Sequence, residues 1–273
     1  MKSFERDRRR KFGQNFLTDM NVARKIVEAA QLTKDSDVLE IGPGDGVLTR
    51  LMAKQCKHVL AVEKDSIAAE KLITSLQDPH AHILQADILT YEYLQHFGRG
   101  EDGIVNFTIV SNLPYNAGTH ILQMLLTASL RPKRLVVMLQ KEVADRVLAK
   151  AGNTSMLSVV CQWFAHIEPL MEVQPEAFVP RPHVVSKVIV ITPKKNSELL
   201  VPFGEEKEVF RIAKMGFASK RKKLSNNLSA SLNIPRETVE NFFQEMGLSS
   251  SVRAEELSLQ NWLDLAKRVG SVS

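Results

Sequence analysis

Apolar and polar residues alternate in blocks along the first half of the chain, and the blocks have the lengths of strands and amphipathic helices. Short apolar runs predict four strands, at residues 38–41, 58–63, 82–87 and 109–112. Apolar residues spaced three and four apart predict five helices, at residues 21–30, 49–57, 66–76, 118–127 and 141–149. Because strands and helices alternate, we expect an α/β fold with a doubly wound parallel sheet.

The pattern changes in the second half of the chain. Two late strands are predicted at residues 157–164 and 186–192, with a long proline-containing loop at residues 169–182 between them. Residues 194–206 are polar and turn-rich, as expected of a linker, and the apolar residues after them have the spacing of short helices. The expected division is therefore an α/β domain over residues 1–193 and a small all-helical domain over residues 194–273.

Composition narrows the class of protein. The chain has 273 residues, 44% of them hydrophobic, and its apolar runs are far shorter than the roughly twenty residues that cross a bilayer. The N-terminus has no apolar run of the secretory type, so we expect a cytoplasmic protein without a membrane segment. Its two cysteines, Cys56 and Cys161, lack C-x-x-C spacing and a histidine cluster, which predicts buried free thiols and no metal site. Without an exposed apolar stripe, a monomer is expected.

Positive charge is concentrated in two short runs. The net charge is +5 with a pI near 9.1, and much of the excess lies at residues 6–11 and 220–223. Clustered Lys and Arg bind a phosphate backbone by releasing counterions, which evenly spread charge does not do. Either run alone also fits a solvated surface, so the pair predicts a nucleic-acid partner only together with a base-binding motif.

Three glycines at alternate positions, Gly42, Gly44 and Gly46, follow the first strand directly. Glycine permits positive φ and has no Cβ, so the backbone can approach a ligand closely. The spacing G-x-G-x-G departs from the G-x-G-x-x-G of dinucleotide sites. The turn therefore predicts a nucleotide-type βα unit, with flavin, NAD and a purely structural turn still open.

Polar side chains follow the next three strands. Glu63 ends the second strand, about twenty residues after the first glycine, where a carboxylate suits both hydroxyls of a ribose. Asp87 ends the third strand and can accept from an adenine amine, and Asn112 ends the fourth. Open α/β sheets bind ligands at the carboxyl ends of their strands. The glycine turn, Glu63, Asp87 and Asn112 come at four successive strand ends, and together they predict an S-adenosylmethionine site.

The motif Asn112-Leu113-Pro114-Tyr115 adds a second binding feature. Pro114 has no N–H and biases Leu113 to extended geometry, so the carbonyl oxygens of Asn112 and Leu113 can face a ligand. Such a pocket selects an exocyclic amine such as adenine N6, and Tyr115 can stack on the base, worth roughly 1–3 kcal/mol. We expect Asn112, Leu113 and Tyr115 to be catalytic by positioning the target adenine, without a general base. The adenine must be flipped out of its helix to reach them. Phe178 is a weaker candidate for holding the same base.

Taken together, these motifs resemble the ribosomal RNA adenine N6-dimethyltransferase family. The matching segments are G-Q-N-F-L at 13–17, E-I-G-P-G-D-G-V-L-T at 40–49, V-E-K-D at 62–65, Q-A-D-I at 85–88, N-L-P-Y at 112–115 and F-V-P-R-P-H-V-V-S at 178–186. Residues 217–228 resemble the C-terminal basic helix of the family, with Lys220 and Lys223 where Arg and Thr are usual. The resemblance thus spans nearly the whole chain.

The resemblance implies a Rossmann-like class I S-adenosylmethionine-dependent methyltransferase fold. Residues 1–193 would be the catalytic domain that binds S-adenosylmethionine, and residues 194–273 a helical domain that orients RNA. The implied donor contacts are Asn15, Leu17, Gly42, Glu63, Asp87 and Asn112. Of these, Asn15 and Leu17 rest on the resemblance alone.

The implied activity is an enzymatic one, two methyl transfers to N6 of each of two adjacent adenosines in the 3′-terminal hairpin of small-subunit (16S) rRNA. The partner would be small-subunit rRNA or a pre-30S particle, with a role in subunit biogenesis. A large-subunit (23S) rRNA methylase of the antibiotic-resistance type shares the catalytic motif and remains open. An NAD-dependent oxidoreductase is disfavoured by the glycine spacing, and a non-catalytic assembly factor by the intact motif at residues 112–115.

Overall fold

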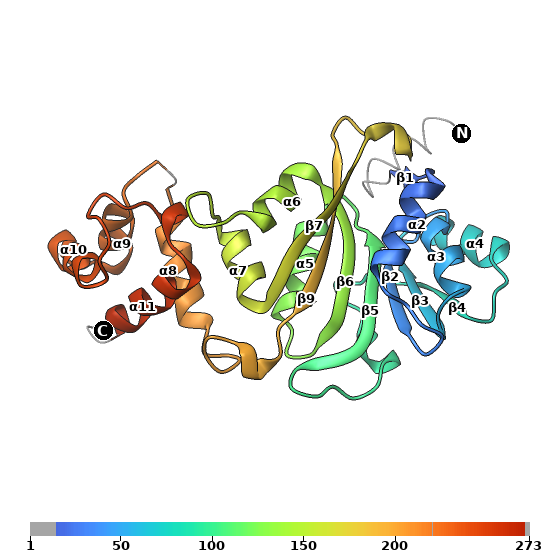
Figure 1. Cartoon of the computed structure of the whole chain (residues 1–273), viewed down its shortest axis with the longest axis horizontal. Coiled ribbons are helices and arrows are strands. Elements are labelled where there is room, and N and C mark those ends of the chain that lie inside the picture. Colours follow the sequence, from blue (N-terminus) through green and yellow to red (C-terminus); the bar gives the residue numbers. More distant parts are fainter. Residues whose placement is uncertain (1–14, 220, 271–273) are drawn as a thin grey trace. The chain divides into compact units, whose positions relative to one another are not determined.

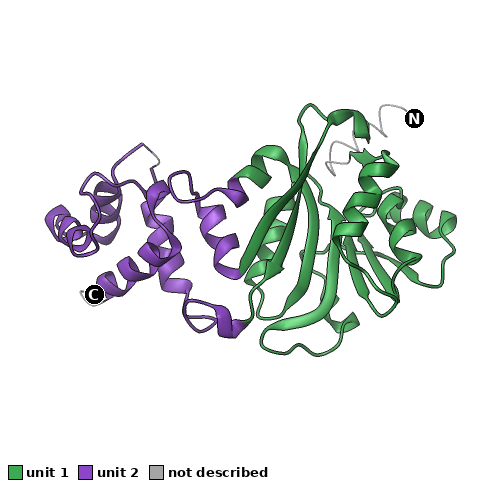
Figure 2. Ribbon diagram, in the orientation of Figure 1, with its two compact units in different colours: residues 1–145, 165–195 green, residues 146–164, 196–273 purple. Residues whose placement is uncertain are grey.

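The computed structural model describes residues 15–219 and 221–270, and the chain divides into two compact units (Figure 2). Unit 1 comprises Met1–Asp145 and Ala165–Lys195, and unit 2 comprises Arg146–Phe164 and Asn196–Ser273. The second boundary, after residue 195, lies close to the expected one, whereas residues 146–164 group with the C-terminal helices. No helix in the described ranges is both long enough and apolar enough to cross a membrane.

Unit 1 is built on a seven-stranded sheet in the order β4-β3-β2-β5-β6-β9-β7 (Figure 1). The strands are β2 (Asp37–Ile41), β3 (His58–Glu63), β4 (Ala81–Gln85), β5 (Ile104–Asn112), β6 (Arg131–Gln140), β7 (Ala165–Val173) and β9 (Ser186–Pro193). The pairs among β4, β3, β2, β5 and β6 are parallel, and β9 is antiparallel to both of its neighbours. The α/β prediction with a doubly wound parallel sheet is confirmed, with an antiparallel edge added.

Helices cover both faces of this sheet. They are α2 (Met20–Ala29), α3 (Val47–Ala53), α4 (Ser66–Ser75), α5 (Gly118–Thr127) and α6 (Lys141–Leu148), the last of which crosses the unit boundary. The main core packs α2 and α3 against one face, through residues such as Ile26, Met52 and Val110. Side-chain caps begin two of the helices, because Asp19 accepts from the first turn of α2 and Asp65 from that of α4.

Two predictions in the second half of the chain are wrong. Residues 157–164 form a helix, α7 (Met156–Phe164), and the strand β7 follows it directly. Seven of the nine α7 residues are buried, so the segment is apolar all round and periodicity cannot separate it from a buried strand. The loop expected at residues 169–182 is in part strand, since Pro169 lies in β7 beside a register shift that accommodates a proline.

A second, two-stranded sheet joins distant parts of unit 1. Strand β1 (Phe16–Leu17) pairs antiparallel with β8 (Phe178–Val179). The Thr18 N–H and hydroxyl both donate to the Ala177 carbonyl, at 2.8 and 3.1 Å. This pairing holds the segment at residues 15–17 in place without support from neighbouring sequence.

The described part of unit 2 is helical. Besides α7 it contains α8 (Lys207–Gly216), α9 (Leu224–Leu232), α10 (Arg236–Glu245) and α11 (Leu259–Gly270). The run resembling a basic helix is not one helix, because α8 ends at Gly216 and residues 221–223 lie in the loop before α9. Lys220 and the basic run at residues 6–11 fall outside the described residues.

Candidate functional site

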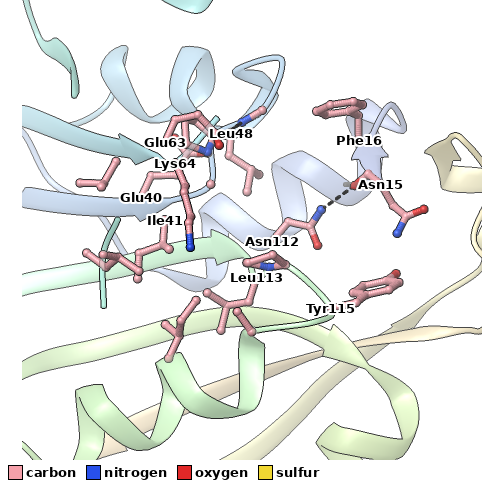
Figure 3. A pocket seen from close by; sticks show the side chains of 18 of the residues that line it. Asn15, Phe16, Glu40, Ile41, Leu48, Glu63, Lys64, Asn112, Leu113 and Tyr115 are labelled. Carbon is pink, nitrogen blue, oxygen red and sulfur yellow. Dashed lines mark hydrogen bonds between the residues drawn. The ribbon is translucent and has the colours of Figure 1, made fainter. Parts of the chain in front are cut away.

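A pocket of about 220 Å³ lies where β2, β3, β4 and β5 end, on the carboxyl edge of the sheet (Figure 3). The four parallel strands bring their ends to one edge, which is where open α/β sheets bind ligands. The predicted site residues all line this pocket: Asn15, Leu17, Gly42, Glu63, Asp87, Asn112, Leu113 and Tyr115. The structure therefore brings together residues that are up to 100 positions apart in the sequence.

The glycine turn forms one wall of the pocket. Gly42, Gly44 and Gly46 have φ values of +68°, +56° and +77°, which a residue with a Cβ rarely adopts. A Cβ on Gly44 would lie 2.7 Å from the Phe16 ring, so this glycine also permits close packing. At Gly42 the nearest atom to such a Cβ is 3.9 Å away, which leaves space above the backbone. The turn thus presents bare backbone to the pocket.

A serine that the sequence reasoning missed holds the start of this turn. The Ile41 N–H donates to the Ser111 hydroxyl at 2.7 Å, and Ser111 is fully buried. The Gly42 N–H donates to the Val62 carbonyl at 2.9 Å. The turn is therefore fixed to β5 on one side and to β3 on the other. A polar residue just before the end of an apolar strand was the only signal for Ser111.

Glu63 is buried beside the glycine turn, with 5% of its surface exposed. Its two carboxyl oxygens accept from the Gly44 N–H at 3.2 Å and from the Asp65 N–H at 2.9 Å. Burial raises the pKa of Glu63, and these backbone donors partly offset the effect. A carboxylate has about four acceptor positions, so Glu63 can still accept from a pair of hydroxyl groups.

Asp87 has a partner that the sequence analysis did not foresee. Its side chain accepts from the Leu89 N–H at 3.1 Å and forms a 2.8 Å ion pair with Lys64, which also lines the pocket. The bond from Lys64 lowers the pKa of Asp87, so this carboxyl group is charged. The pocket therefore has a negative acceptor at the end of β4, with an exposed lysine beside it.

A third carboxyl group, that of Glu40, also lines the pocket. It is 2% exposed and accepts a 2.6 Å hydrogen bond from the Thr49 hydroxyl. Burial raises the pKa of Glu40 to about 8, with a smaller contribution from the charge of Glu63. The bond to Thr49 was not predicted, because Glu40 lies inside an apolar strand and Thr49 is on α3.

The two polar atoms of the Asn112 side-chain amide differ in their partners. Its Nδ2 donates to the Asn15 carbonyl at 3.0 Å, a contact drawn in Figure 3. Its Oδ1 is buried and accepts no hydrogen bond from any residue that the structure describes. A buried acceptor without a donor costs about 1–3 kcal/mol, which a ligand N–H would recover. Asn112 is therefore poised to accept from a bound donor group.

Leu113 and Tyr115, which follow Asn112 in the motif, are held by hydrogen bonds to β6 and β9. The Leu113 N–H donates to the Met138 carbonyl at 3.1 Å, and the Leu113 side chain is buried. The Tyr115 hydroxyl lies 2.5 Å from the Ser186 hydroxyl, and burial raises the pKa of Tyr115. Phe178 belongs to the core and is 2% exposed, so the suggestion that it holds a base is wrong. Of these two aromatic candidates only Tyr115 lines the pocket.

The pocket offers a ligand hydrogen-bond acceptors and the exposed backbone of the glycine turn. Across residues 15–219 and 221–270, no three His, Cys, Asp or Glu side chains are grouped to hold a metal ion. Cys56 and Cys161 are free and buried, as predicted. The acceptors at Glu63, Asp87 and Asn112 suit a ligand with hydroxyl and amine donors.

Solved structures share the fold. The dimethyladenosine transferase from Plasmodium falciparum has a TM-score of 0.73 and 23% identity, covering 92% of this chain and 95% of its own. The 23S rRNA methyltransferase ErmE has a TM-score of 0.70 and 24% identity, covering 94% of this chain and all of its own. At such identities the likeness establishes a shared Rossmann-like fold and nothing finer.

Relatives found by sequence are more similar to this chain and identify its family. Ribosomal RNA small subunit methyltransferase A of Leuconostoc mesenteroides is 35% identical over 263 residues, 94% of this chain and 88% of that protein. The protein of the same name from Prochlorococcus marinus is 37% identical over 269 residues, 96% of this chain and 93% of its own. A sequence profile described as ribosomal RNA adenine dimethylase matches residues 5–270. The chain belongs to the ribosomal RNA adenine dimethylase family.

Proposed function

We propose that the protein is an S-adenosylmethionine-dependent methyltransferase that dimethylates N6 of two adjacent adenosines in the 3′-terminal hairpin of small-subunit rRNA. The observation that carries the proposal is the unpaired, buried Oδ1 of Asn112 at the end of β5. It is an acceptor at the place where a reacting amine must be held. Family membership supplies the reaction class, and the small-subunit names of the relatives favour this RNA.

The residues of the pocket fit S-adenosylmethionine. The space above Gly42 would admit the donor, Glu63 would accept from its ribose hydroxyls and Asp87 from its adenine amine. Asn15 and Leu17 would close the same pocket, because the β1–β8 pairing places them there. When bound, the donor supplies an electrophilic methyl group on a sulfonium.

Residues 112 and 113 would then position the nucleophile. The N6 lone pair of adenine is delocalised into the ring, which makes the amine a poor nucleophile. In the first transfer, acceptance of both N–H bonds, by the Asn112 Oδ1 and the Leu113 carbonyl, would orient the amine and favour sp³ geometry. In the second transfer one of these oxygens would accept the single remaining N–H. The same oxygens would stabilise the positive charge that develops on N6, an effect of preorganised dipoles. In each transfer the N6–methyl bond would form as the methyl–sulfur bond of the donor breaks, and the N6 proton would then pass to solvent. The chain's residues therefore contribute positioning and electrostatics, and no general base is assigned.

The target base must leave its helix to reach these oxygens. An adenine in a duplex is stacked and cannot enter a pocket of this kind without flipping. Tyr115, the last residue of the motif, lines the pocket and offers the ring on which the base would stack. The basic loop at residues 221–223 in unit 2 adds positive charge that suits an RNA backbone. We therefore propose that unit 1 catalyses the reaction and that the helical unit orients the RNA.

The competing substrate is large-subunit rRNA. The fold likeness to ErmE does not separate the two, because the same fold serves both proteins. The names of the sequence relatives favour small-subunit rRNA. We propose in addition that the substrate is a pre-30S particle and that the protein is cytoplasmic. We further propose that the protein acts as a monomer.

The test is a methyl-transfer assay with purified protein, labelled donor and undermethylated ribosomal subunits, followed by nucleoside analysis. We expect label in N6,N6-dimethyladenosine near the 3′ end of small-subunit rRNA. Label in large-subunit rRNA alone would replace the substrate assignment. Donor binding without any label would indicate a non-catalytic assembly factor.

A further inference from the structure

We propose that Ser186, the last residue of the F-V-P-R-P-H-V-V-S segment, is a positioning residue that fixes the Tyr115 ring for stacking on the target base. The inference rests on the proposed function for the role of Tyr115, and on the structure for the contact itself. It gives a purpose to a serine that lies 71 positions from the catalytic motif.

Ser186 is well placed to act as a fixed anchor. It is fully buried, and it is the first residue of β9, where it pairs with Gln140 of β6 and with Val173 of β7. Because β9 runs antiparallel to β6, its first residue lies on the same edge of the sheet as the end of β5. The serine hydroxyl therefore has little freedom to move relative to the catalytic motif.

The next residue holds the same strand end from the opposite face. Neighbouring side chains of a strand point to opposite faces, so Lys187 points away from Ser186. Lys187 is paired with Asp145 and lies 3.5 Å from Glu172, and Lys141 is paired with Glu172 as well. Lys187 therefore has acidic partners on α6 and β7 on one face, while Ser186 bonds Tyr115 on the other. The anchor is thus supported on both faces of the sheet.

The contact is made at the part of Tyr115 farthest from the reaction. Figure 3 shows the Tyr115 hydroxyl on the side of the ring away from Asn112. The 2.5 Å bond to Ser186 therefore restrains the tip of the ring and leaves its face and near edge to the pocket. A ring tethered at its backbone and at its tip cannot swing about the Cα–Cβ bond, because that rotation would carry the hydroxyl away from Ser186. Stacking on such a ring costs less conformational entropy than stacking on a free one.

The tether can be measured without donor or RNA. The chain has three tyrosines, Tyr91, Tyr93 and Tyr115, so protein labelled with 3-fluorotyrosine gives few ¹⁹F resonances, and Tyr115→Phe assigns one of them. We expect a Tyr115 resonance typical of a restrained ring in the native sequence. In Ser186→Ala it should shift and show faster ring motion. Ser158→Ala is the control. It removes a fully buried hydroxyl in unit 2, whereas Ser186 is in unit 1, and it should leave the Tyr115 resonance unchanged.

A double-mutant cycle connects the tether to the reaction. Ser186→Ala and Tyr115→Phe should each lower the single-turnover methylation rate about tenfold, since a small misplacement of a positioning group has effects of this order. The double variant should be no slower than either single variant, because both remove the same bond. Donor affinity, measured by calorimetry, should be the same in all four proteins.

The outcomes separate the two proposals. An unchanged ¹⁹F signal in Ser186→Ala overturns the tether, whatever the enzyme does. A changed signal with an unchanged rate, or with losses that multiply in the double variant, overturns the positioning role. Absence of methylation by the native protein would contradict the proposed function, and the ¹⁹F result would still decide whether Ser186 fixes the ring.

Discussion

At the scale of single residues, Asn112 shows how a local signal acquires meaning from the fold. In the sequence it is an asparagine at a strand end, which is more often a cap or a turn residue. In the structure its Nδ2 is bound to the Asn15 carbonyl and its buried Oδ1 is left without a donor. The contact spans 97 positions, so no local pattern could have revealed it. The amide thus has one structural end and one end for a ligand.

Asn112→Ala should abolish methylation and leave RNA affinity nearly intact. The variant removes the acceptor that would orient N6, and loss of one preorganised dipole typically costs about a hundredfold or more in rate. Single-turnover assays and RNA-binding titrations measure the two effects. Asn106→Ala, at an exposed position of the same strand, is the matched control and should keep its rate. Retained turnover in the Asn112 variant would exclude the proposed role.

Residues that the sequence reasoning missed are those whose partners lie elsewhere in the chain. Ser111 bonds the Ile41 N–H, and Lys64 pairs with Asp87. Nothing in a single sequence distinguishes such a serine from a strand filler, or such a lysine from a solvated charge. By contrast, Gly42 and Glu63 were found because the geometry of a βα turn fixes their spacing.

Glu40 makes stability depend on pH. Its pKa is about 8 in the folded protein against an ordinary 4.5, so the folded state binds more protons than the unfolded state between these values. Stability contributed by the protonated group is therefore lost as pH rises through that window and is constant above it. Glu40→Gln keeps an acceptor for Thr49 and removes the ionisation. We expect native protein to lose about 2 kcal/mol more than Glu40→Gln between pH 6 and 8 in urea unfolding.

The same experiment contains its own check. Burial also raises the pKa of Glu63, so some pH dependence should persist in the Glu40→Gln protein. Parallel stability curves for the two proteins would mean that Glu40 is ionised in the folded state at neutral pH. The sign of the difference above pH 8 is the decisive quantity, because the variant should then be the more stable protein.

At the scale of elements, prediction succeeded where a segment has a clear period or clear ends. The helix expected at residues 118–127 and the strand expected at residues 58–63 coincide with α5 and β3. It failed at α7, where burial on nearly all sides removes the periodic signal. The following strand β7 was missed because Pro169 reads as a loop residue unless the register shift beside it is known. Both errors come from tertiary context overriding a local pattern.

Gly216, the last residue of α8, packs closely against Trp262 of α11 and Leu224 of α9. A Cβ there would lie 2.5 Å from the Trp262 ring and 2.8 Å from Leu224. Gly216→Ala should therefore destabilise unit 2 by about 1–3 kcal/mol through overpacking, although alanine is the better helix former. Thermal unfolding measures the loss. Gly270→Ala, whose Cβ meets nothing within 4 Å, is the matched control, and equal stability of the two variants would contradict the packing argument.

At the scale of the whole molecule, the site depends on topology more than on any one motif. Parallel strands bring Gly42, Glu63, Asp87 and Asn112 to one edge, and the β1–β8 pairing adds Asn15 to them. The first four follow from the parallel strands that the pattern predicts, because each of these residues comes at or just after a strand end. Asn15 and Leu17 could be expected only from the family resemblance, because an antiparallel pair across about 160 residues leaves no periodic trace.

The units do not coincide with a single cut in the sequence. Trp163 and Phe164 of α7 are fully buried, and both pack edge-on against Phe210 of α8, at ring distances of 5.6 and 5.8 Å. A fragment of residues 1–195 keeps α7 and lacks α8. We therefore expect it to expose this aromatic pair, bind a hydrophobic dye and unfold with less cooperativity than the full chain.

Replacement of residues 146–164 by a flexible Gly/Ser linker in the same fragment is the informative comparison. If α7 belongs to the helical unit, the fragment with the linker lacks only a segment whose partners were already absent. Dye binding should then fall, and cooperative urea unfolding should return. The sheet, its pocket and the β1–β8 pair all lie in the retained residues. Cooperative unfolding of the 1–195 fragment without dye binding would instead place α7 with the sheet, and a catalytic domain could then be cut near residue 193 as the sequence suggested.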